Sequence, residues 1–159
     1  MKAIIIYYSY SGNTKKVAGV LRGYLQQKAQ VEEAELEARD ESAAFLGQCR
    51  RAFWHKRAEI EPVNVDLGDY DLICLGTPVW AFGPAPAINA YLDKCSGLEN
   101  KQVILFTTFG SGTGNNRCLN YMQEILAKKG AKGFKRFSVQ QIKVGNPQQV
   151  LLKIKECLE

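Results

Sequence analysis

The chain has 159 residues, 46% of them apolar, and a formal net charge of +5 from 21 Lys and Arg against 16 Asp and Glu. This size and composition predict one globular domain, residues 1–159, with a sizeable hydrophobic core, and argue against a disordered chain. No apolar run approaches the roughly 20 residues that span a bilayer. No signal-peptide cleavage site follows the first apolar run, so we expect neither secretion nor membrane association.

The cysteine and histidine content limits the chemistry. Five cysteines are scattered along the chain without a C-x-x-C pair: Cys49, Cys74, Cys95, Cys118 and Cys157. An odd, scattered set favours reduced thiols in the cytoplasm over disulfides or a zinc site, and Cys74 is expected to be buried in a strand. His55 is the only histidine, which argues against a histidine-based metal site or a Ser/His catalytic pair.

Short apolar runs alternate with amphipathic stretches along the chain. Strands are predicted at Lys2–Tyr8, Glu33–Glu37, Asp71–Leu75, Val103–Thr108 and Lys135–Val139. Helices are predicted at Thr14–Lys28, Ala87–Lys94, Arg117–Lys129 and Pro147–Leu158. Such alternation is typical of a parallel sheet covered by helices on both faces. The sequence therefore predicts an α/β fold, a three-layer, doubly wound sandwich around a five-stranded parallel sheet.

The segment Ser9-Tyr10-Ser11-Gly12-Asn13-Thr14 joins the first predicted strand to the first predicted helix. The first N–H groups of a helix lack intrahelical partners and the helix dipole favours negative charge, so such a loop suits a phosphate. The hydroxyls of Ser9, Ser11 and Thr14 add neutral donors. No Gly-Lys-Ser/Thr motif is present, which excludes a nucleoside-triphosphate loop of that type. The alternative is an ordinary turn in which Ser11 or Asn13 caps the helix.

Two further predicted strands end in loops of unusual composition. The run Asp71–Leu75 is followed by Gly76-Thr77-Pro78-Val79-Trp80-Ala81-Phe82-Gly83, in which the Trp and the Phe are poorly placed for a core. The run Gln102–Thr108 is followed by Phe109-Gly110-Ser111-Gly112-Thr113-Gly114-Asn115. In a parallel sheet all three loops lie at the carboxyl edge, where open α/β sheets bind ligands. A phosphate loop, aromatic faces and free backbone N–H groups together predict a site for a flat, phosphorylated heterocycle.

The sequence resembles the flavodoxin-like family in order along nearly the whole chain. Its first loop matches the family's Thr/Ser-x-Thr/Ser-Gly-Asn-Thr phosphate loop, and Gly76–Trp80 is similar to the Gly-x-Pro-Thr-Trp segment whose Trp stacks on the isoalloxazine of FMN. The resemblance implies strand order 2-1-3-4-5, FMN as cofactor, and Ala81 where the family's backbone approaches flavin N5. The cofactor-binding residues that it implies are Ser9, Tyr10, Ser11, Gly12, Asn13, Thr14, Thr77, Pro78, Val79, Trp80, Ala81, Phe82, Thr108, Phe109, Gly110, Gly112 and Gly114. Because the flavin carries the chemistry, no catalytic acid, base, nucleophile or metal ligand is assigned.

Two features depart from the family pattern. Flavodoxins are strongly acidic, whereas this chain is basic and has Pro84 where acidic residues often occur, so neutral or acidic partners are expected. Many flavodoxins also place a Tyr in the third loop, where it sandwiches the flavin against the Trp. Here Phe109 is followed only by small and polar residues up to Asn116. If Phe109 does not cover the ring, one flavin face is open to a nicotinamide or a quinone for hydride transfer.

Residues 40–62 exceed the short connection that a minimal version of this fold needs. Within them Glu41–Arg57 is predicted to form a helix whose apolar face docks on the sheet. Trp54 falls roughly opposite that face and is surrounded by Arg50, Arg51, Lys56 and Arg57. This side is either the solvated side of a covering helix, or a basic, aromatic platform that contacts a partner or overhangs the flavin.

The main functional prediction is an FMN-binding electron-transfer carrier that serves a redox partner protein or a small-molecule electron acceptor. The alternative is an FMN-dependent NAD(P)H:quinone-type oxidoreductase. A cofactor-less binding module is less favoured, because the loop hydroxyls and Trp80 are intact. The fold hosts carriers and enzymes alike. We expect no nucleic-acid or membrane partner, and a monomer or homodimer.

Overall fold

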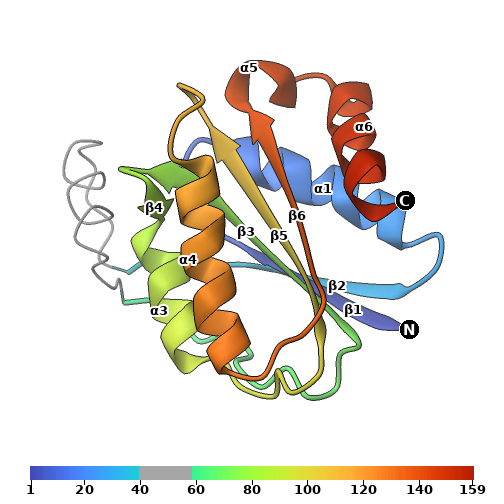
Figure 1. The fold of residues 1–159 in the computed structure, drawn as a ribbon, viewed down its shortest axis with the longest axis vertical. Coiled ribbons are helices and arrows are strands. Elements are labelled where there is room, and N and C mark those ends of the chain that lie inside the picture. The colour runs from blue at the N-terminus through green and yellow to red at the C-terminus, as the bar shows by residue number, and fades with distance from the viewer. Residues whose placement is uncertain (40–58) are drawn as a thin grey trace.

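The computed structural model describes residues 1–39 and 59–159, and these form a parallel sheet between two layers of helices (Figure 1). The long strands are β1 (Lys2–Tyr7), β2 (Gln30–Glu35), β3 (Leu72–Trp80), β5 (Gln102–Phe109) and β6 (Phe134–Gln140). They pair in parallel in the order β2-β1-β3-β5-β6. The predicted α/β sandwich with five parallel strands in flavodoxin-like order 2-1-3-4-5 is therefore confirmed.

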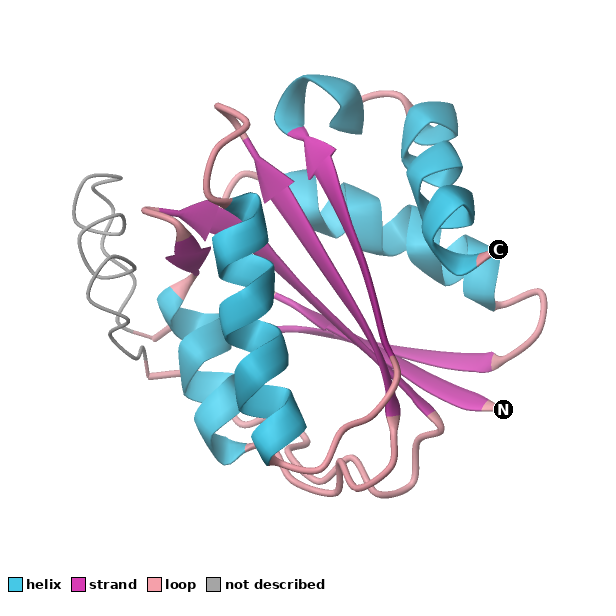
Figure 2. Cartoon of the chain, in the orientation of Figure 1, coloured by secondary structure: helices cyan, strands magenta, loops and turns pink. Residues whose placement is uncertain are grey.

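Each face of the sheet carries its own helices and its own core (Figure 2). On one face lie α1 (Asn13–Leu25), α5 (Gln141–Val144) and α6 (Pro147–Leu158), and on the other lie α3 (Pro86–Lys94) and α4 (Asn115–Lys128). Strand β1 serves both cores, since Ile4 and Ile6 face α3 and α4 while Ala3 and Ile5 face α1. The four helices predicted in the described residues are present within three residues at either end. The one-turn helix α5 was not predicted.

Strand β3 is longer than predicted. It continues five residues past Leu75 to Trp80, pairs with β5 as far as Pro78, and then pairs antiparallel with β4 (Gly83–Pro84). The backbone N–H of Tyr8 donates to the Gly76 carbonyl at 3.1 Å, so the backbone of Gly76 faces β1. Pro78, two residues on, faces the same side beyond the end of β1. Its missing N–H therefore costs no ladder bond, and a proline fits inside a central strand.

The residues just before and just after segment 40–58 lie side by side, close to the end of β2. Ala38 and Ile60 form an antiparallel bridge, and the Arg39 N–H donates to the Glu59 carbonyl at 2.7 Å. The predicted helix Glu41–Arg57 and the basic cluster around Trp54 lie outside the described residues. The second strand begins at Gln30, three residues before the predicted start, and ends at Glu35.

Candidate cofactor site

Three loops meet at the carboxyl edge of the sheet, as expected. They are the loop between β1 and α1, the turn between β3 and β4, and the loop between β5 and α4. The second and third loops touch, because a Cβ added to Gly114 would lie 2.4 Å from Cδ1 of Phe82 and 3.1 Å from its Cα. Only a glycine fits there. The three predicted loops therefore lie at one edge, although they come from three distant parts of the chain.

The first loop leaves the start of α1 available for an anion. Gly12 is the N-cap residue, in the left-handed region with φ +84°, and nothing lies within 4 Å of the place where a Cβ would point. It supplies no side-chain cap. The Ser9 hydroxyl instead accepts a hydrogen bond from the Lys15 N–H at 3.2 Å, and Asn13 donates its amide to the Ser11 hydroxyl, also at 3.2 Å. The alternative of a turn capped by Ser11 or Asn13 is therefore wrong. The donors fit a phosphate.

Thr14 and Thr108, both predicted site residues, are buried against each other. Their hydroxyl oxygens lie 2.9 Å apart, and each residue is at most 1% exposed. This contact ties the first turn of α1 to the end of β5, which are 94 positions apart in the sequence. The two threonines thus hold the phosphate loop in place relative to the third loop.

The two aromatic residues of the second loop, Trp80 and Phe82, differ in burial, which the sequence did not predict. Trp80 is only 5% exposed and belongs to the core, so the expectation that it lies outside a core is wrong. Its ring packs edge-to-face against Tyr8 and Tyr10, with centroids 5.7 and 5.6 Å away. Phe82 is 44% exposed, as expected for a residue available to a ligand.

The turn that carries Phe82 has an unusual backbone held by a buried threonine. Ala81 and Phe82 both have positive φ, at +46° and +67°, which is uncommon for residues with a side chain. The Thr77 hydroxyl donates to the Pro78 carbonyl at 2.9 Å and accepts from the Ala85 N–H at 3.0 Å. Such strained turns persist where the surroundings fix them, often at ligand sites.

The third loop places its aromatic side chain away from the other two loops. Phe109 ends β5 and lines a hollow of about 340 Å³ together with Val139, Gln140 and Leu152. From Gly110 to Asn116 the loop has only small and polar residues. Tyr121 lies inside α4 and packs against the core.

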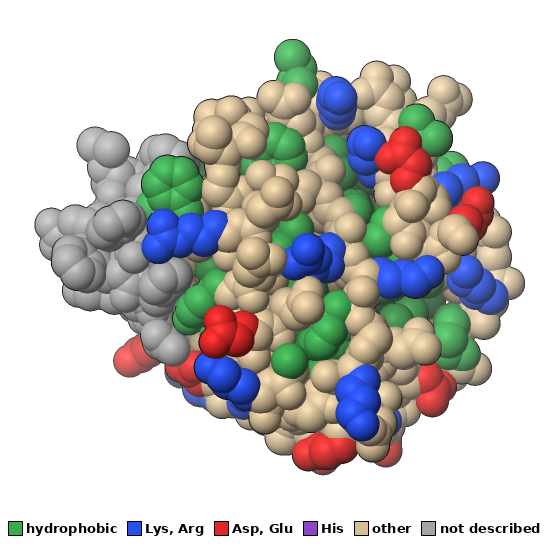
Figure 3. All heavy atoms as spheres, in the orientation of Figure 1, with side chains coloured by type: hydrophobic (Ala, Val, Ile, Leu, Met, Phe, Trp, Pro, Cys, Tyr) green, Lys and Arg blue, Asp and Glu red, His purple; other side chains and the backbone are tan. Residues whose placement is uncertain are grey.

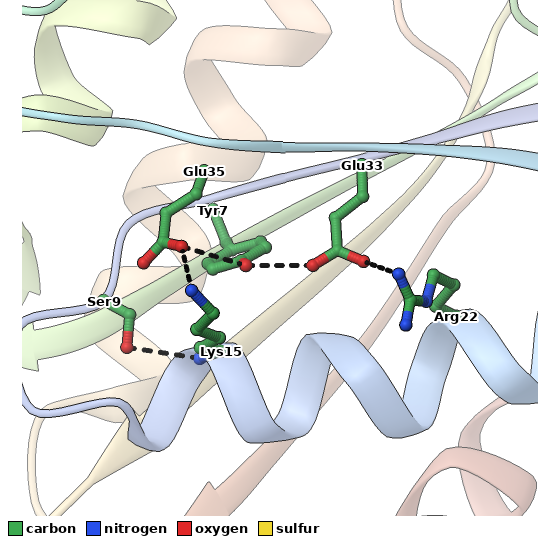
Figure 4. A network of polar contacts seen from close by, with 6 residues as sticks. All are labelled: Tyr7, Ser9, Lys15, Arg22, Glu33 and Glu35. Carbon is green, nitrogen blue, oxygen red and sulfur yellow. Dashed lines mark hydrogen bonds and ion pairs between the residues drawn. The ribbon is translucent and has the colours of Figure 1, made fainter.

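Charged groups lie behind and beside these loops. The segments 8–14, 76–84 and 108–116 contain no Asp, Glu, His, Lys or Arg. Behind the first loop, the Tyr7 hydroxyl donates to Glu33 at 2.9 Å (Figure 4), and burial together with this carboxylate raises the pKa of Tyr7. No acid–base group was predicted for the site.

The surface over α4, β6 and α6 is basic (Figure 3). Residues 115–159 contain nine cations, namely Arg117, Lys128, Lys129, Lys132, Lys135, Arg136, Lys143, Lys153 and Lys155. Against them stand three carboxylates, Glu124, Glu156 and Glu159, which leaves a balance of +6 compared with +5 for the whole chain. This surface adjoins the site, since Asn115 at the start of α4 and Arg136 line one hollow of about 400 Å³.

Solved structures share this fold along almost the entire chain. A flavoprotein from Lactobacillus acidophilus NCFM, in complex with FMN, is 27% identical with a TM-score of 0.66, covering 92% of this chain and 98% of that one. A putative flavoprotein from Bacteroides uniformis is 20% identical with a TM-score of 0.73, covering 97% of each chain. Flavodoxin 2 from Bacillus cereus is 20% identical with a TM-score of 0.62, covering 98% of this chain and 99% of that one.

The sequence also matches a known protein family. No curated protein matches the chain. The model of the family described as NADPH-dependent FMN reductase matches residues 1–141, which contain all three loops. Within the described residues, no helix is long and apolar enough to cross a bilayer. The expectation of FMN is confirmed by the family match. The chain therefore belongs to the NADPH-dependent FMN reductase family and is an FMN-binding flavoprotein of flavodoxin-like fold.

Proposed function

We propose that this protein uses FMN to take hydride from a nicotinamide dinucleotide and passes the electrons to a small-molecule or protein acceptor. When bound, the FMN supplies the hydride-accepting and electron-donating chemistry. The residues of the chain bind and orient it. The first turn of α1 and the hydroxyls of Ser9 and Ser11 hold the phosphate, Thr14 fixes that turn through Thr108, and the turn at Ala81 and Phe82 lies beside the ring.

The observation that carries this proposal is the burial of Trp80. A carrier that encloses its flavin needs aromatic side chains on both faces, whereas Trp80 packs between Tyr8 and Tyr10 in the core. Phe109 lines a hollow beside β6, and the rest of the third loop has no aromatic residue. Because Trp80 is buried, Phe109 lines another hollow and the third loop has no further aromatic residue, one face of the flavin is left open for a nicotinamide to stack. The family match supports the same conclusion.

The basic surface over α4, β6 and α6 supports a dinucleotide as the donor. Nicotinamide dinucleotides are anionic through their pyrophosphate, and NADPH carries a further phosphate. A basic surface beside a site raises the local concentration of anions and their rate of encounter. Arg136, which lines the hollow next to Asn115, is well placed to contribute, whereas Lys153 in the same hollow is paired with Glu156 at 2.6 Å.

An electron carrier is the second candidate, and Phe82 is the observation that favours it. This residue is exposed at the sheet edge and is able to cover one face of a flavin. A carrier would exchange electrons with a partner protein and would not react with a nicotinamide dinucleotide.

Anaerobic mixing separates the two candidates. The FMN-loaded protein is mixed with NADPH and, separately, with NADH, and the flavin absorbance is followed in time. We expect bleaching by at least one dinucleotide, much faster than in matched solutions of free FMN. An added quinone or free flavin should then restore the absorbance. If neither dinucleotide bleaches the bound flavin faster than free FMN, the protein is a carrier and the proposal is overturned.

A further inference from the structure

Two cations of α1 are each paired with a carboxylate of β2 (Figure 4), Lys15 at the loop that precedes the helix and Arg22 further along the helix. The Lys15 ammonium lies 2.7 Å from an Oε of Glu35, and the Arg22 guanidinium lies 3.1 Å from an Oε of Glu33. Glu33 and Glu35 are two residues apart on a strand, so both face α1. The pairs therefore set two positive charges of α1 against two negative charges of β2, and the Lys15–Glu35 pair lies next to the loop.

Tyr7 fixes the two carboxylates. Its ring is almost fully buried at the end of β1, and its hydroxyl donates to Glu33 at 2.9 Å and lies 3.4 Å from an oxygen of Glu35. Tyr7 and Glu35 are register partners in the β1–β2 pair. Because the phosphate loop begins directly after β1, this arrangement places Glu35 next to the loop.

Lys15 contacts the loop through its backbone and Glu35 through its side chain. Its backbone N–H donates to the Ser9 hydroxyl at 3.2 Å, within the loop, while its ammonium is directed to Glu35 (Figure 4). Lys15 is the third residue of α1, where a free cation would act strongly on a bound phosphate. The hydrogen bond to Glu35 also raises the pKa of Lys15, so the ammonium stays charged and attracted to that carboxylate.

We propose that Glu35 is a specificity-determining residue of the FMN site, because it neutralises Lys15 and keeps its ammonium away from the phosphate. This rests on FMN binding through the Ser9–Thr14 loop. The phosphate is then held by backbone N–H groups and hydroxyls alone. The preference for FMN over riboflavin is consequently smaller than a free Lys15 would produce.

Two single variants and their combination test this charge balance. Removing the charge of Glu35 with Glu35→Gln leaves Lys15 unpaired, and FMN should bind about three- to tenfold more tightly at low salt. Lys15→Met leaves Glu35 unpaired beside the phosphate and should weaken FMN binding to a similar extent. In the double variant neither charge remains, so FMN affinity should return close to that of the wild type.

Riboflavin, salt and a second glutamate provide the controls. Riboflavin lacks the phosphate, so its affinity should be the same in all these variants. The FMN effects should shrink as ionic strength rises, because salt screens exposed charges. Glu32→Gln removes a carboxylate from the opposite face of β2, where it pairs with Lys2 at 3.0 Å, and should change neither affinity.

The affinities are measured by titrating each flavin into apoprotein and following its fluorescence. The proposal is overturned if Glu35→Gln leaves FMN affinity unchanged, or changes FMN and riboflavin affinity equally. It is also overturned if the double variant binds FMN as weakly as Lys15→Met, since Lys15 would then contact the phosphate directly. The titrations need no dinucleotide, so their outcome is independent of the anaerobic mixing experiment.

Discussion

The hydroxyl oxygens of Thr14 and Thr108 lie 2.9 Å apart in a fully buried contact between the first turn of α1 and the end of β5. Two of the three loops predicted to bind FMN are thus fixed relative to each other by one hydrogen bond. A buried hydroxyl that loses its partner costs more than a pair of hydroxyls that is replaced together. The contact therefore links the stability of the fold to the geometry of the site.

Replacing one of these threonines should destabilise the protein more than replacing both. We expect Thr14→Val or Thr108→Val to lower the free energy of unfolding by about 1–3 kcal/mol, because the remaining hydroxyl is buried without its partner. The double variant Thr14→Val/Thr108→Val should regain part of this loss. Urea unfolding of the four proteins measures the coupling. Additive losses would show that the two hydroxyls do not depend on each other.

Gly114→Ala should be more damaging than Gly12→Ala. Both glycines have positive φ, at +88° and +84°, so either alanine adds backbone strain of about 1–2 kcal/mol. A Cβ at position 114 also collides with Phe82, whereas one at position 12 meets nothing within 4 Å. We expect Gly114→Ala to lower both stability and flavin affinity beyond the effect of Gly12→Ala, as measured by urea unfolding and flavin titration. Equal effects on stability would mean that Phe82 yields easily.

Phe82→Ala should weaken binding of FMN and of riboflavin alike, because we expect the side chain to lie beside the ring and not beside the phosphate. An aromatic contact of this kind contributes about 0.5–1.5 kcal/mol beyond its buried area, so affinity should fall severalfold or more. The exposed side chain contributes little to the core, and unfolding should change little. Leu152→Ala, also exposed but on α6, is the matched control in the same flavin titrations. A loss for FMN alone would place Phe82 at the phosphate instead.

Tyr7 should make stability fall at alkaline pH. Its pKa is raised above the ordinary value of 10.0 by burial, with Glu33 adding to the shift. Below that value the tyrosine is protonated in both states, and stability does not depend on it. Above it the unfolded chain loses the proton while the native state retains it, so the free energy of unfolding decreases. Tyr7→Phe should reduce this decrease in urea unfolding measured between neutral pH and about pH 11. If Tyr7→Phe leaves the pH dependence of the free energy of unfolding unchanged, Tyr7 is not the group that causes the decrease.

Most of the fold could be predicted from the sequence, because the patterns that predict its strands and helices lie within short stretches of the chain. The apolar runs of β1, β3 and β5 and the amphipathic spacing of α1 and α4 are visible in short windows. The extension of β3 to Trp80 was missed because Pro78 normally ends a strand. Only the strand order shows that β1 has already ended beside Pro78, so that no hydrogen bond is lost.

The sequence alone predicted the sheet and the three loops at its carboxyl edge, because residue type and spacing carry that information. Tertiary structure decided which side chains of these loops are exposed and which are buried. Trp80 and Phe82 are two positions apart in one loop, yet one is buried by Tyr8 and Tyr10 while the other is exposed. The pairing of Lys15 with Glu35 likewise depends on packing α1 against β2. Burial and charge neutralisation arise between segments distant in the chain, and no local pattern encodes them.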